Sequence, residues 1–428
     1  MEKEKIFGDI PWYYTITPEQ AITVRYVVRM KDEIDGGALR RAVRETMLRY
    51  PYMMKRLVVT DREYCLVPND LPIVVVHGKD PVNLGGKEAN YHQIAISYFG
   101  RGIYFNNTHA ICDGRGRSPI LHTLMYYYCT YRYGEPVTMD GVNLSGSPID
   151  PMEYDDPYTR AIPEPENDFS SLFQTREPFR LSEAGLVSGE GDSQIHCIRV
   201  KEDALMQCCK GQDATPNSAL ALLMCRAIDS LHPDNRKPII PGIYCDLRKA
   251  MKSPLSHRTL VTTLDLVYDD HVRALSFSDQ NTAFRGRMLL LSDPSFQLFA
   301  QKFQQEACNK VSGMATLKQK TDAACGAMAG LFKAHTFLVS YSGKSNYGSC
   351  DKYISSFFPQ VHATGIDLLM EITAADGWFY VTFIQEWRED CYFNAFLKEL
   401  QAQGLDCDLL YSSRNDYSRF IFEPEIFE

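Results

Sequence analysis

The stretch N-N-T-H-A-I-C-D-G, residues 106–114, decides the expected fold. It contains the pattern H-x-x-x-D-G, with His109, Asp113 and Gly114 at its fixed positions. Chance supplies this pattern in roughly one chain of this length in 25, so the three residues alone are weak evidence. Taken by itself, His109 is more often a core histidine, and Asp113-Gly114 is more often a plain turn. The surrounding sequence has to decide between these interpretations.

A predicted hairpin and a predicted helix flank the pattern. Residues 92–99 and 102–109 resemble the two arms of an antiparallel hairpin, the first with clear apolar alternation. Residues 113–116 predict a turn, and apolar side chains at helical spacing predict a helix over 118–131. His109 therefore ends a strand just before a turn into a helix. Two rigid elements would hold its side chain there, as catalytic geometry requires.

A long crossover separates two halves with similar predicted elements. From about residue 147 to 190 the sequence is rich in proline, glycine and acidic residues, which is typical of a long connection. Before it, strands are expected over 21–30 and 73–76 and a helix over 38–50. After it, strands are expected over 196–200, 242–246, 335–340, 368–373 and 378–385, and helices over 204–210, 216–230 and 390–403. Residues 279–333 are expected to be mostly helical, with interruptions at Pro294, Gly313 and Gly326.

The composition is that of an ordinary globular protein, with 428 residues, 45% of them hydrophobic and 23% charged. A formal net charge of -9 argues against a nucleic-acid partner, which usually requires a basic surface. The sequence contains no apolar run long enough to span a membrane and no signal-peptide pattern. The 13 cysteines have neither disulfide-framework nor zinc-site spacing, so we expect reduced thiols, a cytoplasmic location and no metal site.

Two further motifs follow the H-x-x-x-D-G pattern along the chain. Residues 243–249, I-Y-C-D-L-R-K, end an expected strand with Arg248, and residues 339–344, V-S-Y-S-G-K, form a later strand motif. With these three landmarks the chain resembles, over nearly its whole length, the chloramphenicol-acetyltransferase-like superfamily, which includes condensation domains of peptide synthetases and alcohol acetyltransferases. The resemblance implies an α/β fold (α+β mixed sheets) with two lobes and an active-site channel between them. The N-terminal lobe would comprise residues 1–180, crossover included, and the C-terminal lobe residues 181–428.

The same resemblance implies an acyltransferase. It would move an acyl group from an acyl-CoA thioester to a hydroxyl or amine of a small acceptor, with His109 as general base and acyl-CoA as substrate rather than bound cofactor. Asp113 would anchor the loop by pairing with Arg248, and Gly114 would keep the channel clear beside the histidine. Condensation domains usually carry two adjacent histidines, and Thr108 replaces the first one here. This difference favours free acyl-CoA over a carrier-protein donor.

Other functions and further site residues stay open. A stand-alone condensation enzyme would take its acyl group from an acyl or peptidyl carrier protein. A non-catalytic descendant would use the channel for binding or as a scaffold. Ser340 and Ser342 are candidates for stabilising the oxyanion of the reaction. Cationic candidates for binding the phosphates of coenzyme A are Arg115, Lys249 and Lys344.

Simpler interpretations also stay open for two residues near the motifs. Arg248 would form a surface ion pair with Asp246 that contributes little to stability. Cys112 would act as a nucleophile, but the local sequence offers it no activating partner.

Overall fold

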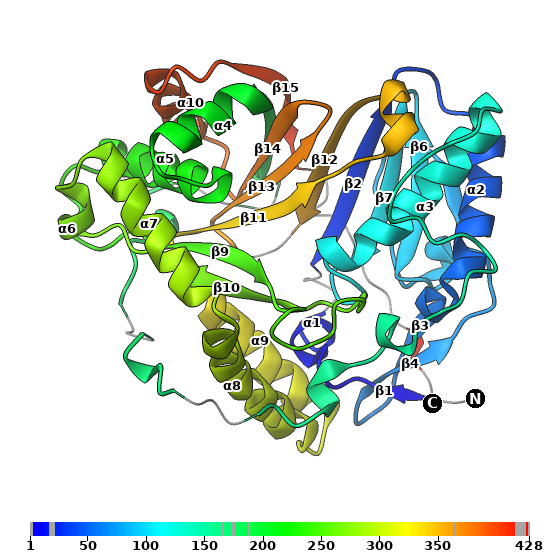
Figure 1. Ribbon diagram of the computed structural model, residues 1–428. Helices are drawn as coiled ribbons and strands as arrows, with labels where there is room; N and C mark the ends of the chain where they lie inside the picture. Colours follow the sequence, from blue (N-terminus) through cyan, green and yellow to red (C-terminus); the bar gives the residue numbers. More distant parts are fainter. Residues whose placement is uncertain are drawn as a thin grey trace.

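A computed structural model describes residues 3–16, 22–163, 167–172, 176–186, 189, 191–362, 365–415 and 425–426. Figure 1 shows two α/β lobes side by side, each with its own sheet and its own covering helices. The mixed α/β class and the two lobes expected from the sequence are confirmed. Ala21, the first residue of a predicted strand, and parts of the predicted crossover lie outside the described residues.

The N-terminal lobe is built on a five-stranded sheet with the order β12-β2-β7-β6-β5. Its strands are β2 (Thr23–Met30), β5 (Val75–His77), β6 (Ile94–Phe99), β7 (Gly102–Thr108) and β12 (Ile354–His362). Helices α2 (Gly36–Arg49) and α3 (Gly114–Tyr133) bury their apolar faces against this sheet. A second, small sheet contains β1 (Glu4–Lys5), β3 (Lys55–Val59), β4 (Tyr64–Pro68) and β16 (Glu425–Ile426).

The C-terminal lobe is built on a seven-stranded mixed sheet with the order β10-β9-β11-β13-β14-β8-β15. Its strands are β8 (Gln194–Lys201), β9 (Pro241–Asp246), β10 (Val261–Asp265), β11 (Phe337–Lys344), β13 (Leu368–Ala375), β14 (Trp378–Gln385) and β15 (Cys407–Arg414). Strand β11 runs parallel to both of its neighbours, β9 and β13. The outer face packs against α4 (Glu202–Gly211), α5 (Pro216–Leu231), α6 (Asp270–Arg273), α7 (Phe277–Leu291) and α10 (Cys391–Ala402).

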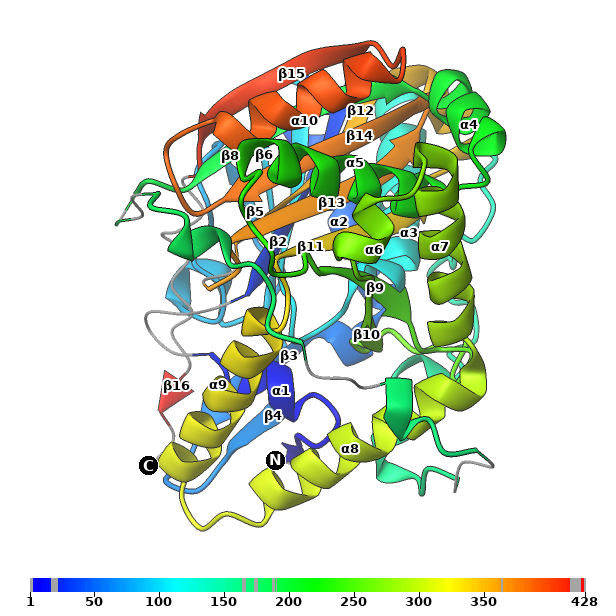
Figure 2. The same ribbon diagram turned by 90° about the vertical axis from the view of Figure 1, so that its left-hand side faces the viewer.

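Segments from both halves of the chain join the lobes. Strand β12, from the C-terminal half of the chain, pairs antiparallel with β2 and so becomes an edge strand of the N-terminal sheet. Helices α8 (Pro294–Ser312) and α9 (Leu317–Lys333) share an apolar cluster with the short helix α1 (Ile10–Tyr13), next to which they lie in Figure 2. The division of the chain at residue 180 stays a prediction, because segments from both sides of it share a sheet.

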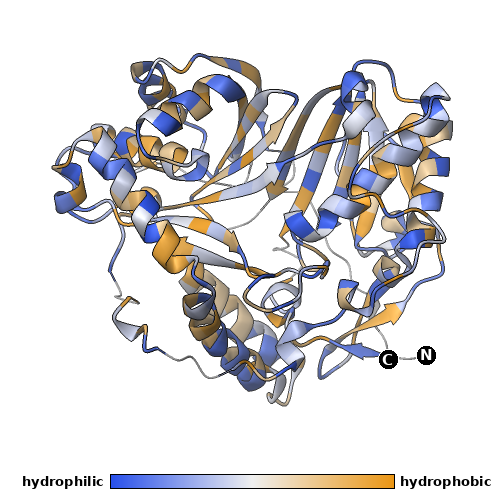
Figure 3. Cartoon of the chain, viewed as in Figure 1, coloured by the Kyte–Doolittle hydropathy of each residue, from blue (hydrophilic) through white to orange (hydrophobic). Residues whose placement is uncertain are grey.

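Strand β13 is buried on both faces because it lies between two apolar cores. Leu368 and Met370 belong to the core under the outer helices, whereas Leu369 and Ala375 belong to the core shared with the N-terminal lobe. Side chains alternate along a strand, so Glu371 points towards the N-terminal lobe with Leu369 and Ala375. Figure 3 shows the hydrophobic residues concentrated on the strands and on the helix sides that face them.

Two predicted helix features are wrong. Helix α3 begins at Gly114 rather than at residue 118, because the Asp113 side chain caps it by accepting a hydrogen bond from the backbone N–H of Gly116. Gly326 lies within α9 and does not interrupt it, whereas Pro294 and Gly313 do mark the ends of α8. Of the helices that the structure describes, none combines the length and the hydrophobicity that crossing a membrane would require.

Candidate active site

His109 directly follows β7 and is held by both halves of the chain. Its backbone N–H donates a hydrogen bond to the carbonyl of Ile22 (2.8 Å), next to β2. Its carbonyl accepts a hydrogen bond from the hydroxyl of Thr259 (2.6 Å), in the loop between β9 and β10. The position of the histidine therefore depends on the contact between the lobes.

The imidazole of His109 lies in surroundings that favour its neutral form. The indole ring of Trp12 stacks on it, with ring centroids 4.5 Å apart and planes 18° from parallel. Burial lowers the pKa of His109 below its ordinary value, and the opposing attractions of the Asp113 carboxylate and of the histidine's own carbonyl are smaller. Nδ1 is buried and has no hydrogen-bond partner of standard geometry among the described residues. The side chain as a whole is half-buried and lines a cavity, so Nε2 is the nitrogen open to a substrate.

The loop after His109 is anchored by a buried ion pair between Asp113 and Arg248. The guanidinium donates two parallel hydrogen bonds, from Nη2 to Oδ1 (2.8 Å) and from Nη1 to Oδ2 (3.0 Å). Backbone N–H groups of Gly116 and Leu260 donate to the same two oxygens, at 2.7 and 2.9 Å. Burial alone would raise the pKa of Asp113, but the charge and hydrogen bonds of Arg248, together with the backbone hydrogen bonds of Gly116 and Leu260, outweigh it and hold the pKa below its ordinary value. The carboxylate therefore stays ionised at neutral pH.

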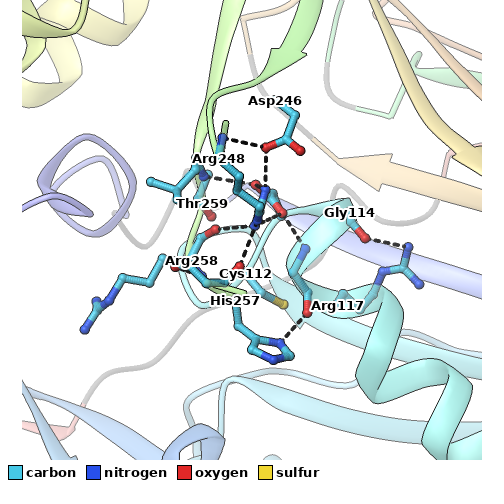
Figure 4. Close-up of polar contacts among 12 residues, drawn as sticks. Cys112, Gly114, Arg117, Asp246, Arg248, His257, Arg258 and Thr259 are labelled. Atoms are coloured by element: carbon cyan, nitrogen blue, oxygen red, sulfur yellow. Dashed lines mark hydrogen bonds and ion pairs between the residues drawn. The ribbon is translucent and has the colours of Figure 1, made fainter. Parts of the chain in front are cut away.

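Every N–H of the Arg248 guanidinium has a hydrogen-bond partner. Figure 4 shows the guanidinium together with two of these partners, Asp246 and Arg258. Besides the two bonds to Asp113, Nε donates to the carbonyl of Ser256, Nη2 to the carbonyl of Arg258 and Nη1 to the Asp246 carboxylate. The ion pair between Arg248 and Asp246 that the sequence suggested is present. Its carboxylate side chain is 45% exposed, whereas the side chain of Asp113 is 2% exposed, so Asp113 is the buried partner. The planar fork of an arginine meets this five-bond requirement, and the ammonium group of a lysine does not.

Two glycines of α3 permit close packing around the loop. A Cβ atom on Gly116 would lie 2.1 Å from the carbonyl oxygen of His257, a backbone atom that cannot move away alone. His257 also contacts Gly116 through its side chain, since Nδ1 lies 2.5 Å from the Gly116 carbonyl. A Cβ atom on Gly114 would meet only side-chain ends, the hydroxyl of Tyr26 at 3.1 Å and that of Ser342 at 3.3 Å. Gly116 is therefore required for the fold, and Gly114 for the space next to Ser342.

A cavity of about 70 Å³ lies between the lobes and brings most of the predicted site residues together. His109, Asp113 and Gly114 reach it from the N-terminal lobe, and Ser340 and Ser342 reach it from β11. Its other lining residues include Trp12, Tyr26, Tyr244 and Glu371. Two larger hollows elsewhere, of about 350 and 470 Å³, contain no comparable base held by both lobes. Within the described parts of the chain, no cluster of side chains has the composition of a metal site.

The cations predicted to bind coenzyme A lie outside this cavity. Arg115, Lys249 and Lys344 are exposed, and Lys344 forms an ion pair with Glu202 (2.7 Å). Their role stays a prediction. Cys112 is buried, and burial raises the pKa of its thiol to about 12, which opposes the thiolate that a nucleophile needs.

Comparison with solved structures places this site within a known fold. Polyketide synthase associated protein 5 from Mycobacterium tuberculosis is similar with a TM-score of 0.62 and 14% identity, over 93% of this chain and 96% of that chain. The first condensation domain of the CDA synthetase gives 0.61 and 14%, over 96% and 99%. F. sporotrichioides TRI101, complexed with coenzyme A and T-2, gives 0.59 and 9%, over 96% and 100%. The chain has the chloramphenicol-acetyltransferase-like fold.

No family model matches the sequence, and no curated protein matches it either. Sequence reasoning also missed several residues of the candidate site. Trp12 carries no sequence signal, because nothing near it indicates that it stacks on a histidine almost 100 positions away. Gly116 follows the motif by two residues, and a second glycine there was a usable signal. Glu371 was another, because it is the single charged residue of the mostly apolar strand β13.

We predict that Asp113→Asn lowers the free energy of unfolding by about 3–5 kcal/mol, because it leaves a buried guanidinium without its countercharge. Asp246→Asn is the matched control, since it removes the exposed partner of the same guanidinium and should cost at most about 1 kcal/mol. Urea unfolding of the two variants measures both values. Equal losses would mean that the buried pair is not the anchor.

Gly116→Ala should destabilise the fold by about 1–3 kcal/mol or more, because the added Cβ meets the backbone of His257. Gly114→Ala should fold with a smaller loss, because the groups that it meets are side-chain ends. Thermal unfolding of both variants tests this difference. A more stable Gly116→Ala than Gly114→Ala would contradict it.

Proposed function

We propose that this protein is an acyltransferase that moves an acyl group from an acyl-CoA thioester to a hydroxyl or amine of a small acceptor. The observation that carries the proposal is the His109 imidazole, which lines a cavity between the two lobes of this fold and whose neutral form is favoured because burial lowers its pKa. A general base near neutral pH needs such a group within reach of the proton that it removes. A protein of the same fold, F. sporotrichioides TRI101, is complexed with coenzyme A, which supports a coenzyme A thioester as the donor.

In the proposed reaction, Nε2 of His109 takes the proton of the acceptor O–H or N–H while the freed electron pair attacks the thioester carbonyl carbon. The C=O π electrons move to oxygen and give a tetrahedral oxyanion. As the oxyanion collapses, the C–S bond breaks and the imidazolium returns its proton to the leaving thiolate. The products are the acylated acceptor and free coenzyme A, and His109 is neutral again. No acyl-enzyme forms, so no serine or cysteine nucleophile is required.

Asp113 acts in this scheme as a positioning residue. Each of its oxygens already accepts two hydrogen bonds, from Arg248 and from a backbone N–H, so neither oxygen is needed to orient the imidazole. Ser340 and Ser342 are the proposed donors to the oxyanion, and Ser340 would have to exchange the Glu371 carboxylate, to which it is hydrogen-bonded, for the substrate. The hydroxyls of Ser342 and Tyr26 are hydrogen-bonded to each other, so Ser342 would have to turn its proton from Tyr26 towards the substrate.

Arg115 and Lys249 are the proposed contacts to coenzyme A phosphates. Both side chains are exposed. Each lies within two residues of a member of the Asp113–Arg248 pair, so a phosphate group could reach them from the solvent. Lys344 is proposed for the same purpose, but it would have to exchange Glu202 for a phosphate.

A carrier-protein-bound thioester is the second candidate donor, because a condensation domain shares the fold over 96% of this chain. Thr108, which replaces the first of two histidines, is fully buried and donates a hydrogen bond to Gln93 (3.1 Å). Its side chain thus takes no part in the cavity. Turnover with a phosphopantetheine-loaded carrier protein, but not with coenzyme A thioesters, would select this candidate.

The decisive measurement is mass-spectrometric detection of free coenzyme A after incubation of acyl-CoA donors with small alcohols and amines. We expect acceptor-dependent release by the wild type that falls by roughly 10²-fold or more in His109→Ala. Cys112→Ala is the control and should keep most of the activity. Equal release by wild type and His109→Ala would refute the role of the histidine. If neither acyl-CoA donors nor carrier-protein-bound donors are consumed across a broad panel of acceptors, a non-catalytic binding protein is favoured.

The pH dependence follows from the lowered pKa of His109. Only the neutral imidazole accepts a proton, so kcat/KM should rise with pH through the pKa of His109 and level off above it. The midpoint should lie below about 6.5, the ordinary value for histidine. Trp12→Leu should move it towards that value by admitting water. Both profiles are best measured in the Glu371→Gln background, because the Glu371 carboxyl lines the same cavity and titrates near 7. A midpoint above 6.5 in the Glu371→Gln background, with Trp12 intact, would contradict the neutral-base assignment.

A further inference from the structure

A buried carboxylate without a cationic partner lines the active-site cavity. Glu371 is 7% exposed, and within the described residues no lysine, arginine or histidine forms an ion pair with it. The hydroxyl of Ser340 is its hydrogen-bond partner. Burial raises the pKa of Glu371 to about 7, although Ser340 and the charge of Arg117 act in the opposite direction. An apolar residue here would avoid the cost of burying a carboxylate, so packing alone does not account for Glu371.

Hydroxyl groups surround this carboxylate on the face of the C-terminal sheet that points to the N-terminal lobe. Ser340 is the cross-strand partner of Glu371, and Tyr244 follows the Ile243–Val339 pair on the neighbouring strand. Tyr244 and Ser340 line the cavity together with Glu371 and His109. The two lobes therefore supply different groups to one cavity, a base from the N-terminal lobe and a carboxylate with hydroxyls from the C-terminal lobe.

Arg117 stabilises the ionised form of this carboxylate from a distance. Its guanidinium is buried and lies over the ring of Tyr26, 3.0 Å from the ring centre. It also donates a long hydrogen bond to the Gly114 carbonyl (3.4 Å), so it belongs to the same helix end as the His109 loop. The cavity thus combines a long-range positive charge with a carboxylate that has a hydroxyl partner, Ser340, but no ion-pair partner among the described residues.

We propose that Glu371 is the acceptor-recognising residue of this site and binds a hydrogen-bond-donating group, a hydroxyl or an ammonium, that the acceptor carries next to its nucleophile. This inference rests on the proposed acyltransferase function and names its acceptor class, a small molecule such as a diol or an amino alcohol. An alcohol with only one polar group would leave the buried carboxylate with the Ser340 hydroxyl but no donor group from the acceptor. Sites built to bind a donor group discriminate strongly against ligands that lack it.

Binding without turnover tests this inference separately from catalysis. The probes are 1,2-butanediol, 2-amino-1-butanol and 1-butanol, and their affinity for the wild-type protein is measured by ligand-observed NMR without any acyl donor. We expect the diol and the amino alcohol to bind more tightly than 1-butanol. In Glu371→Gln their affinity should fall roughly 10- to 100-fold, with 1-butanol little changed. A larger loss for the amino alcohol than for the diol would identify an ammonium as the preferred partner, and the reverse a hydroxyl.

Glu386→Gln is the matched control, because burial also raises the pKa of Glu386 to about 7 but that residue does not line the cavity. Urea unfolding shows whether each variant is folded, and Glu371→Leu repeats the test with a side chain that cannot accept a hydrogen bond. Diol and amino alcohol binding that is no tighter than 1-butanol binding, or that is equally weakened by Glu386→Gln, overturns the inference. If the expected binding pattern is found but no donor is consumed, the proposed acyl transfer fails while the recognition by Glu371 stands.

Discussion

The buried pair between Asp113 and Arg248 is the interaction on which the geometry of the candidate site depends. It joins the first turn of α3 to the loop that follows β9, and thereby fixes one lobe to the other within a few residues of His109. A buried ion pair contributes net stability only when the remaining donors and acceptors are also satisfied, because removing two charges from water is costly. Here backbone groups complete both partners, with two N–H groups on the carboxylate and two carbonyls on the guanidinium. The pair therefore links the two lobes in a geometry that hydrogen bonds to both partners hold fixed.

The geometry of the candidate site is consequently a property of the two lobes together. The hydroxyl of Thr259 holds the carbonyl of His109, while β12 extends the N-terminal sheet with residues from the other end of the chain. The stacked Trp12 lies in the short helix α1, whose other residues pack with α8 and α9. Relative movement of the lobes would change the enclosure of the imidazole, and with it the pKa that sets its protonation state. Stability between lobes and acid-base chemistry are thus coupled at one residue.

The parts of the structure that local sequence determines were predictable. The hairpin of β6 and β7 and the helix α2 follow from side-chain periodicity over adjacent residues, and His109 was correctly expected at the strand end. The start of α3 was not, because an aspartate before a glycine has the same local signature in a turn as in a helix cap. The pairing of β12 with β2 joins residues more than 300 positions apart, and no local pattern encodes such a contact. That Glu371 and His109 line the same cavity could not be predicted for the same reason, because the two residues lie on different lobes.

The placement of a base and a carboxylate on opposite lobes has an electrostatic consequence for the proposed reaction. Proton transfer to His109 creates an imidazolium in surroundings that lower its pKa, so the enclosure that keeps the base neutral also opposes the charge that catalysis creates. In the proposed reaction an ionised Glu371, which lines the same cavity, would offset part of this cost, because opposite charges attract where water is scarce. The acceptor's second donor group would keep Glu371 ionised before the proton moves. An acceptor that carries such a group would thus stabilise the imidazolium that forms on His109, by keeping Glu371 ionised. Recognition of the acceptor would in this way be coupled to its deprotonation.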